Sequence, residues 1–297
     1  MTQLYLFLTL MIVGTLFLGV NDTQKKKFLR DGIDDQLLIG VSWFLGGIFL
    51  FIIIASIGLP VIKPGFWPAF SATVVLNVVS QSVFIRAFKL ADASLVAPMR
   101  LITPPLVVFT GFIVLREIPT VGGIVGVFLT VFGLGILLSP GKSFSLLAAK
   151  DYIMSERGVQ LGLLGSLLFA LSFPFDKQAV LTSSGIFATA MRMISVGVLV
   201  LGINAILSHR FRQELIPAIK QWRMPILAVS AVSAIGDFLT TQALAYSLAA
   251  YAASLKRLWP FWTVILAGRF LKEENIKQRF AATAIMFIGI IVMVLLG

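Results

Sequence analysis

The chain contains no cysteine and a single histidine, His209, among its 297 residues. Without cysteine there is no disulfide framework, no thiolate zinc site and no cysteine nucleophile. One histidine in a polar stretch does not build a catalytic triad or a histidine metal cluster inside the apolar segments. No GxxxxGK[ST] loop is present, so nothing in the chain predicts ATP hydrolysis. We therefore expect no enzyme activity, no metal and no cofactor.

Charged residues are also scarce, at 12% of the chain against 58% hydrophobic residues. An ordinary soluble domain carries about 25% charged residues. Long apolar runs recur over the whole chain, and each is long enough to cross about 30 Å of hydrocarbon as a helix. This composition predicts an all-α integral membrane protein. The net charge of +11 comes mainly from basic residues in the loops between apolar runs, which argues against nucleic-acid binding.

The apolar runs predict ten transmembrane helices, five in each half of the chain. They cover residues 2–21, 36–58, 66–86, 92–115, 119–139, 158–181, 186–207, 222–246, 250–270 and 277–296. The first repeat is expected over residues 1–140 and the second over residues 158–297, with a connecting loop at 141–157. The N-terminal stretch lacks a basic leader, so we expect a retained span. Two polar stretches lie between spans: 21–36, and 208–223, which predicts an interfacial helix.

The two halves repeat one pattern at a constant offset of 156 residues. Ala87–Glu117 aligns with Ala243–Glu273, and Arg100 thereby matches Lys256. A repeated unit with an odd number of spans has to sit inverted in the bilayer. The sequence therefore predicts two inverted five-helix repeats, an architecture that places a substrate site at the midplane between the halves.

Basic residues set the expected orientation. Among the 24 Lys and Arg residues, only Lys63 and Arg116 lie in even-numbered loops, and a few lie within spans; the rest lie in odd-numbered loops. Cytoplasmic loops retain Lys and Arg. We therefore expect the odd-numbered loops in the cytoplasm and both termini outside, in a bacterial inner membrane.

The repeat, the ten predicted spans and the glycine-rich fifth span, Gly122–Leu138, resemble the drug/metabolite transporter superfamily, specifically its EamA-like members. The resemblance covers nearly the whole chain. It implies a basket of ten helices around a central cavity that works by alternating access, with amino acids, drugs, nucleotide sugars and other metabolites as cargo. It also implies cytoplasmic termini, whereas the charge pattern of this chain predicts the reverse orientation.

Several ionisable residues lie inside the predicted spans, where a charged group costs at least about 2.5–3.5 kcal/mol at a helix centre. They are Arg100, Lys177, Arg192, Lys256, Arg257, Asp176 and Asp237. Such a set predicts a polar cavity rather than a passive anchor. Its excess of cations over acids favours an anionic or zwitterionic substrate.

Arg100 and Lys256 each precede a proline by four residues, Pro104 and Pro260. Proline loosens a helix one turn back, and matched interruptions in two halves are typical of a transporter site. Arg100 and Lys256, with Trp259 close by, are therefore predicted to bind a carboxylate or phosphate. The alternatives are that the cations extend to the membrane interface or pair with the two acids of the spans.

Polar residues of the third and eighth spans complete the predicted cavity. Gln81 matches Asp237 at the repeat offset, and Asn77 shares a helical face with Gln81. The predicted substrate-binding set is Asn77, Gln81, Arg100, Asp237, Gln242, Tyr246, Lys256 and Trp259. Ordinary interhelical hydrogen bonding is the alternative role for these polar side chains.

Asp176 and Lys177 lie near the end of the sixth span. Adjacent residues do not face each other on a helix, so each is expected to pair elsewhere, with Arg192 or Arg100 as partners. A structural clamp and a gating ion pair both fit. The predicted coupling or gating set is Asp176, Lys177, Arg192 and Asp237, and Asp237 is also a candidate proton carrier.

The sequence thus predicts a secondary transporter of a small anionic or zwitterionic metabolite, such as an amino acid or a phosphorylated compound. Expected partners are the substrate, membrane lipid, a proton or other coupling ion, and a second copy in a homodimer, but no nucleic acid. Two alternatives stay open. One is a broad exporter of aromatic or cationic compounds; the other is a protein whose cations handle lipid head groups.

Overall fold

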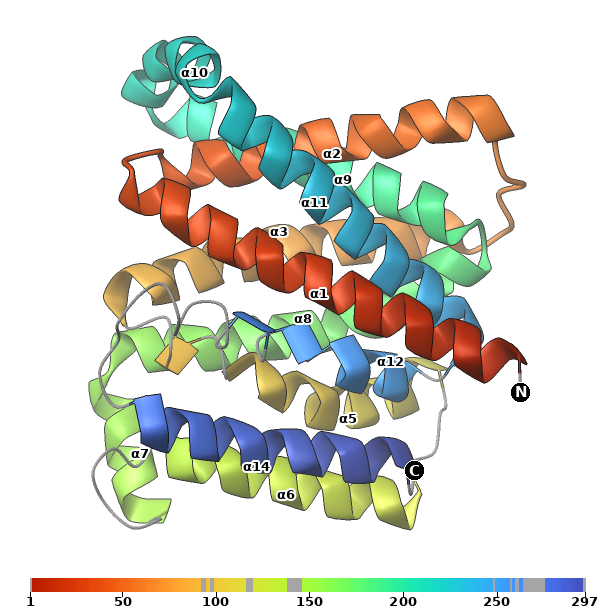
Figure 1. Cartoon of the computed structure of the whole chain (residues 1–297), viewed down its shortest axis with the longest axis vertical. Helices are drawn as coiled ribbons and strands as arrows, with labels where there is room; N and C mark the ends of the chain where they lie inside the picture. Colours follow the sequence, from red (N-terminus) through yellow and green to blue (C-terminus); the bar gives the residue numbers. More distant parts are fainter. Residues whose placement is uncertain are drawn as a thin grey trace. The chain divides into compact units, whose positions relative to one another are not determined.

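The computed structural model describes residues 2–91, 95–96, 99–115, 120–137, 146–247, 249–256, 258–259, 262–263 and 276–295. Every secondary-structure element in these ranges is a helix (Figure 1). Helices are expected in a bilayer because backbone N–H and C=O groups in lipid must bond within the segment. Some positions used in the predictions lie outside the described residues: Arg116, Glu117, Arg257, Pro260, residues 264–273 and residues 141–145 of the connecting loop.

The first half of the chain forms helices close to the predicted spans. They are α1 (Thr2–Arg30), α2 (Asp35–Ile57), α3 (Phe66–Leu90), the 3₁₀ turn η1 (Arg100–Ile102), α5 (Thr103–Leu115) and α6 (Val121–Leu137). One boundary was wrong: α1 continues as a helix beyond residue 21 to Arg30. The stretch past residue 21 contains Lys25, Lys26 and Lys27, and lysine is a good helix former even where the apolar pattern has ended.

The second half forms α7 (Leu146–Ser155), α8 (Arg157–Leu181), α9 (Gly185–Leu207), α10 (His209–Gln221), α11 (Arg223–Gln242), the 3₁₀ turn η2 (Ala243–Tyr246), α12 (Ala249–Lys256) and α14 (Ile276–Leu295). Part of the predicted connecting loop is therefore helical, because its residues Leu146–Ser155 contain mostly good helix formers. Helix α10 occupies the polar stretch where a helix was predicted.

Five helices of the described chain are long and apolar enough to cross a membrane: α1, α2, α8, α9, and α11 continued through η2. Three shorter apolar helices cover Arg100–Val114, Val121–Gly133 and Phe280–Gly289. The first turns of two helices are capped by a side chain of the preceding residue. The Asp34 carboxylate accepts a hydrogen bond from the N–H of Leu37 at 2.9 Å and so caps α2, and the Ser184 hydroxyl accepts one from Phe187 at 3.3 Å and caps α9.

The chain divides into two compact units. The first unit comprises Met1–Val78 and Asp176–Tyr246, and the second comprises Val79–Phe175 and Ser247–Gly297. The boundaries fall inside α3 and α8, so each unit takes helices from both halves of the sequence. The residues of interest are therefore described below one unit at a time.

In the first unit, the second helices of the two halves, α2 and α9, pack against each other over their length. A Cβ added at Gly197 would lie 2.6 Å from the backbone nitrogen of Phe44, and one at Gly47 would lie 2.7 Å from that of Ile194. As the α2 residue number rises, the α9 partner number falls, so the two helices run antiparallel. Antiparallel packing of equivalent helices is expected for repeats of opposite orientation.

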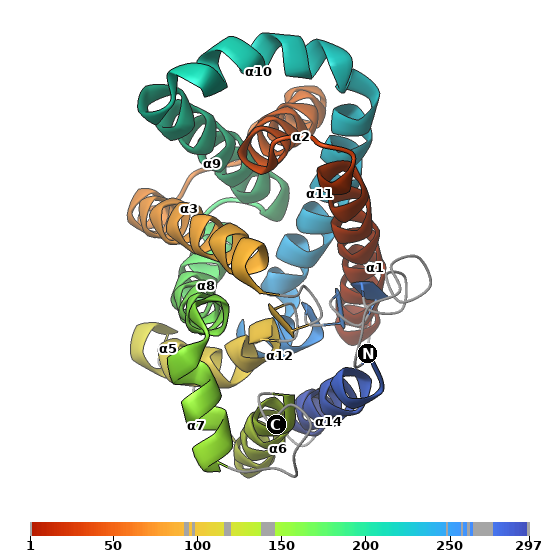
Figure 2. The same ribbon diagram turned by 90° about the vertical axis from the view of Figure 1, so that its left-hand side faces the viewer.

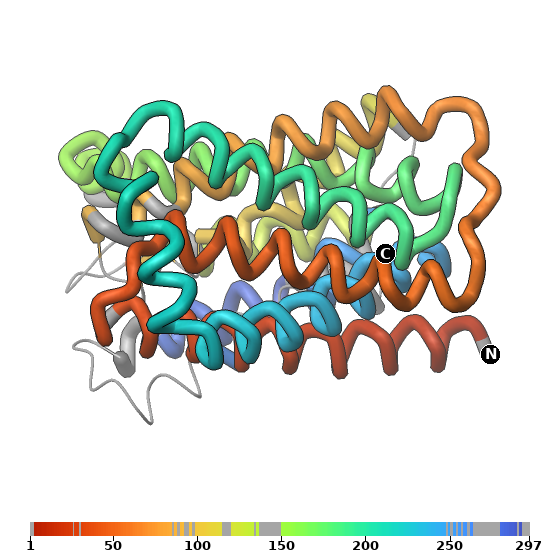
Figure 3. The backbone as a smooth tube through the Cα atoms, turned by 90° about the horizontal axis from the view of Figure 1, so that it is seen from above, coloured from red at the N-terminus to blue at the C-terminus, as the bar shows by residue number. Residues whose placement is uncertain are grey.

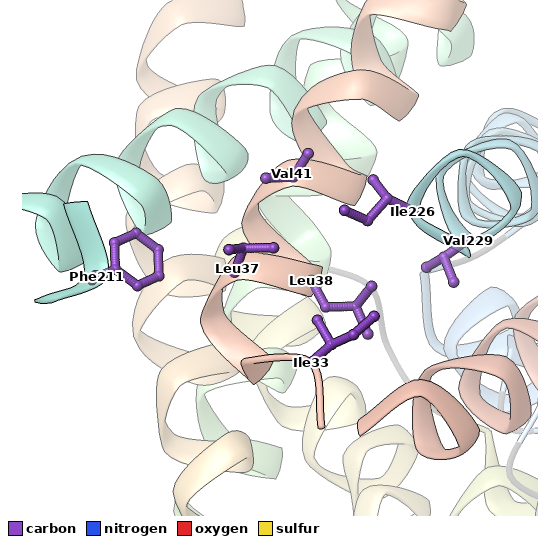
Figure 4. Packing of buried hydrophobic residues seen from close by; sticks show 7 residues of the cluster. All are labelled: Ile33, Leu37, Leu38, Val41, Phe211, Ile226 and Val229. Carbon is purple, nitrogen blue, oxygen red and sulfur yellow. The ribbon is translucent and has the colours of Figure 1, made fainter. Parts of the chain in front are cut away.

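Helix α10 closes the first unit at one end by connecting α9 to α11 (Figures 2 and 3). Its buried Phe211 joins a cluster with Leu37, Leu38 and Val41 of α2, Ile226 and Val229 of α11, and Ile33 (Figure 4). Its opposite face is polar. There Arg210 donates to the Glu214 carboxylate at 2.7 Å, and this hydrogen bond, followed by the charge of Glu214, raises the pKa of Arg210 above its usual value.

In the second unit, the last helices of the two halves, α6 and α14, lie side by side (Figure 1). A Cβ at Gly133 would lie 2.8 Å from the nitrogen of Met286, and one at Gly289 would lie 2.7 Å from the nitrogen of Thr130. Gly289 and Met286 are the repeat equivalents of Gly133 and Thr130. Each half therefore makes the same contact with the other, in antiparallel orientation, as a local twofold axis requires.

Candidate functional site

A buried ion cluster lies in the first unit and joins three helices. Arg192 of α9 contacts Asp176 of α8 and Asp237 of α11, with 3.5 Å between Nη1 and Oδ1 of Asp176 and 3.5 Å between Nη2 and Oδ1 of Asp237. The exposed fractions are 5% for Arg192, 8% for Asp176 and 7% for Asp237. Arg192 also donates to the Thr241 hydroxyl at 3.3 Å. A planar guanidinium suits this role because it presents several donors in different directions.

A second layer of polar side chains comes from α3. The Thr73 hydroxyl donates to Asp176 Oδ1 at 2.5 Å, and Asn77 Nδ2 donates to the Thr73 carbonyl at 2.9 Å and to its hydroxyl oxygen at 3.0 Å. Thr73 and Asn77 are one helical turn apart, so they face the same way. Asn77 is 1% exposed, and its Oδ1 has no hydrogen-bond partner among the described residues.

The remaining predicted residues of the first unit lie near the end of α11 and on α8. Gln242 Nε2 donates to the Tyr246 hydroxyl at 3.4 Å across the start of η2. A Cβ at Gly185 would lie 2.8 Å from Cα of Gln242, so the first turn of α9 packs directly on this backbone. Lys177 is partly buried and follows Asp176 on α8. All are held on helices rather than on loops.

The second unit contains a cluster of a different kind, built from cations and aromatic rings. The Arg100 guanidinium carbon lies 4.4 Å from the centre of the Phe84 ring and 4.7 Å from that of Trp259. Arg100 is 6% exposed and lies in η1, the 3₁₀ turn that precedes α5 and Pro104. The faces of aromatic rings carry partial negative charge and attract a cation, but they do not neutralise the charge of that cation.

Lys256 is the last residue of α12 in the same unit, and its Nζ lies 5.9 Å from the centre of the Phe173 ring.

The helix interruption predicted near Arg100 is seen as a change from 3₁₀ to α geometry after Ile102. Pro260, which matches Pro104 in the repeat, lies outside the described residues. Gln81, on α3, is partly buried, and Ser80 next to it donates to the Gly165 carbonyl at 2.9 Å.

The structure thus divides the predicted site residues between two clusters. Asp176, Arg192 and Asp237 meet directly, and Arg100 meets Trp259. Thr73 and Phe84 were not in the predicted sets although both contact members of them. Helical periodicity could have identified both residues. Thr73 lies one turn before Asn77 and Phe84 lies two turns after it, on the same buried face of α3.

Comparisons with known protein families and solved structures cover nearly the whole chain. The model of the EamA-like transporter family matches residues 6–139 and again residues 156–295. Among solved structures, one crystal structure aligns with a TM-score of 0.68 at 14% sequence identity, covering 98% of this chain and 96% of its own. At that identity the likeness shows the fold alone. No match was found among curated proteins.

Proposed function

The chain belongs to the EamA-like transporter family, an integral membrane family of the drug/metabolite transporter superfamily, and on that premise we propose that it is a secondary active transporter of a small anionic or zwitterionic metabolite. The cargo would be an amino acid or a phosphorylated metabolite. Ten spans, arranged as two inverted repeats, would expose a midplane site to each side of the membrane in turn. The repeats proposed are residues 1–140 and 158–297, joined by 141–157.

The observation that carries this proposal is the setting of Arg100. Its guanidinium carbon lies 4.4 Å and 4.7 Å from the centres of two aromatic rings. Aromatic rings attract a guanidinium but offer its N–H donors no oxygen acceptor, and a carboxylate or phosphate binds such donors in a forked manner. Lys256 adds a second cation in the same unit. Gln81 and Trp259 complete the proposed substrate-binding residues there.

The first unit supports the zwitterionic form of the cargo over a purely anionic one. Its ion cluster has two carboxylates to one guanidinium, and Asn77 Oδ1 is a buried acceptor without a partner among the described residues. Carboxylate and amide oxygens are hydrogen-bond acceptors, and acceptors suit an ammonium group of the cargo. We assign Asn77, Asp237, Gln242 and Tyr246 to cargo binding, and Asp176, Lys177, Arg192 and Asp237 to coupling or gating.

The test is a thermal-shift screen of the purified protein against amino acids, phosphorylated metabolites, nucleosides and organic cations. A ligand that binds only the folded state raises the Tm. We expect a hit among zwitterions or anions that disappears in the double variant Arg100→Gln/Lys256→Gln. The variant Arg212→Gln, which removes an exposed charge from α10, is the matched control and should keep the hit. A ligand-induced rise in Tm that is unchanged in the double variant would contradict the proposal.

A second candidate function is favoured by the same acid-rich cluster. A broad exporter of aromatic or cationic compounds would use Asp237 and the aromatic rings instead of Arg100 and Lys256. In the screen it predicts hits confined to organic cations, lost in Asp237→Asn and retained in Arg100→Gln/Lys256→Gln.

We further propose that α10 lies on the cytoplasmic side, with both termini outside. Helix α10 and its flanks carry Arg210, Arg212, Lys220 and Arg223, and cytoplasmic loops retain such residues. A reporter fused after Gly297 tests this: a tag that is accessible only from the cytoplasm would reverse the assignment.

A further inference from the structure

Helix α10 has one packed face and one exposed face. It runs from the end of α9 to the start of α11 (Figure 2). Phe211 is buried against residues of α2 and α11. The residues that pack on the same cluster share its side of the helix; they are Leu215, Ala218 and Ile219. The remaining residues of α10 are all exposed.

The exposed face of α10 is basic. Arg212 and Lys220 on α10, and Arg223 at the start of α11, are exposed and have no ion pair among the described residues. Arg210 is paired with Glu214, the one acid of this segment. Four Lys and Arg residues against one Glu leave residues 209–223 with a net charge of +3 when the histidine is neutral. We call Arg212, Lys220 and Arg223 the α10 basic face.

The polar stretch between α1 and α2 lies at the same end of the first unit, because Ile33 and Phe28 pack in the cluster that contains Phe211. Its charges balance. Residues 21–36 contain four cations, Lys25, Lys26, Lys27 and Arg30, and four acids, Asp22, Asp31, Asp34 and Asp35. The surplus of positive charge at this end therefore comes from α10 and Arg223.

The residues on either side of α10 set its depth in a membrane. Leu207, the last residue of α9, is 79% exposed, and Met224, the second residue of α11, is 68% exposed. Both belong to helices that are long and apolar enough to cross a membrane. Exposed apolar surface on such helices is surface for lipid tails. Arg223 directly precedes Met224, and long basic side chains extend from such positions toward the head groups.

We propose that the α10 basic face binds the phosphate groups of anionic phospholipids. Amphipathic helices rich in Lys and Arg lie in the plane of the membrane surface, where anionic lipids attract them. The guanidinium groups of Arg212 and Arg223 suit a phosphate because they donate to two of its oxygens at once. Bound lipid holds the adjoining ends of α9 and α11 at the head-group layer. The inference uses the membrane location of the family and does not depend on the proposed cargo.

A phospholipid fits this face better than a soluble anion does. Ile216 is 63% exposed and lies one turn from both Arg212 and Lys220. An apolar side chain among cations gains nothing from a free phosphate ion or from the phosphates of a nucleic acid. Beside a phospholipid it can contact the apolar part of the same molecule.

The test is a thermal-shift titration of the purified full-length protein in detergent, with phosphatidylglycerol and separately with phosphatidylcholine. A lipid that binds only the folded state raises the Tm. We expect phosphatidylglycerol to raise the Tm of wild type more than phosphatidylcholine does. The difference should shrink at high salt, because salt screens exposed charges.

The variant Arg212→Gln/Lys220→Gln/Arg223→Gln removes the α10 basic face. The phosphatidylglycerol concentration that gives half of the Tm rise should increase roughly a hundred-fold, since each Lys or Arg near an anionic surface strengthens binding about five-fold. All three side chains are exposed, so the variant is expected to fold.

The matched control is Arg86→Gln/Lys150→Gln/Arg157→Gln, which removes the same residue types from exposed positions of the second unit. Lys150 and Arg157 adjoin Asp151 and Glu156, so their charges are already balanced. The control should respond to phosphatidylglycerol as wild type does. An equal loss of response in both triple variants would mean that any three surface cations are sufficient, and it would overturn the proposal.

Two other results would contradict the lipid site. The first is an equal rise in Tm with both lipids in wild type, an outcome that needs no variant. The second is the same rise with glycerol 3-phosphate, which has the phosphate but no acyl chains and would identify a site for a free anion. Neither result affects the cargo screen, which depends on Arg100 and Lys256, so failure of one proposal is distinguishable from failure of the other.

Discussion

The two compact units hold buried positive charge in opposite ways. In the first unit, Arg192 lies between the carboxylates of Asp176 and Asp237. In the second, Arg100 lies against the rings of Phe84 and Trp259. Carboxylates fix a guanidinium and cancel its charge, whereas ring faces fix it and leave its field intact. The first arrangement therefore suits a switch that exchanges charge, and the second suits recognition of an anion.

One feature of helix packing, by contrast, is shared by both units. Equivalent helices of the two halves run antiparallel and approach closely at glycines, at Gly197 in the first unit and at Gly133 and Gly289 in the second. The two halves thus provide a common scaffold, and the chemistry differs because some matching positions carry different residues. Gln81 and Asp237, for example, occupy matching positions of the repeat.

The largest expected effect is from removing the cation of the first unit. Arg192→Met removes the guanidinium that contacts the buried carboxyls of both Asp176 and Asp237. Loss of one partner from a buried ion pair typically destabilises a protein by about 3–5 kcal/mol. We expect a large fall in Tm and in the yield of monodisperse protein in detergent.

The matched control is Arg210→Met, which makes the same substitution in the Arg210–Glu214 ion pair on the exposed face of α10. Solvent-exposed pairs contribute little because water screens them. Its Tm should equal that of wild type. If Arg192→Met is as stable as this control, the first unit does not depend on its cation, and the contrast between the units disappears.

Intermediate effects are expected at the helix approaches that the units share. In Gly133→Ala and Gly197→Ala the new methyl group meets backbone atoms at 2.8 Å and 2.6 Å. Overpacking of this kind typically costs about 1–3 kcal/mol. Gly202→Ala, also in α9, meets no atom within 4 Å and should be neutral or stabilising by up to about 1 kcal/mol through helix propensity. Thermal unfolding of the three variants tests this; a drop confined to one unit would show that the scaffolds are not equivalent.

Apolar periodicity and charge were enough to predict most of the fold. The spans follow from runs of apolar residues, and the repeat follows from matched residues such as Arg100 and Lys256. The helical end of α1 and helix α7 were missed because both lie outside apolar runs, where helix propensity rather than hydrophobicity decides. Asp176 was expected to pair with Arg192 or Arg100, and the structure places it against Arg192.

The division of the site residues between two clusters was beyond the sequence. Spans such as α2 and α5 are apolar on every side, so periodicity does not say which face turns toward which neighbour. The contact of Asp237 with Arg192 and the contact of Arg100 with Phe84 both depend on how each helix is rotated about its own axis. The polar residues of α3 are the exception. There, Asn77, Ser80 and Phe84 recur at helical spacing and do share one buried face.

The smallest effect is expected from Arg100→Lys, which keeps the positive charge of the second unit and removes only its planar shape. A lysine ammonium neither stacks flat on an aromatic ring nor binds a carboxylate in a forked manner. The lost stacking should cost about 0.5–2 kcal/mol of stability. The larger consequence should be weaker binding of an anionic or zwitterionic ligand, measured as a smaller ligand-induced rise in Tm. Lys256→Arg is the converse control, since it adds a guanidinium beside Phe173. Equal ligand binding by wild type and Arg100→Lys would mean that charge alone matters there, and the rings around Arg100 would then serve packing rather than recognition.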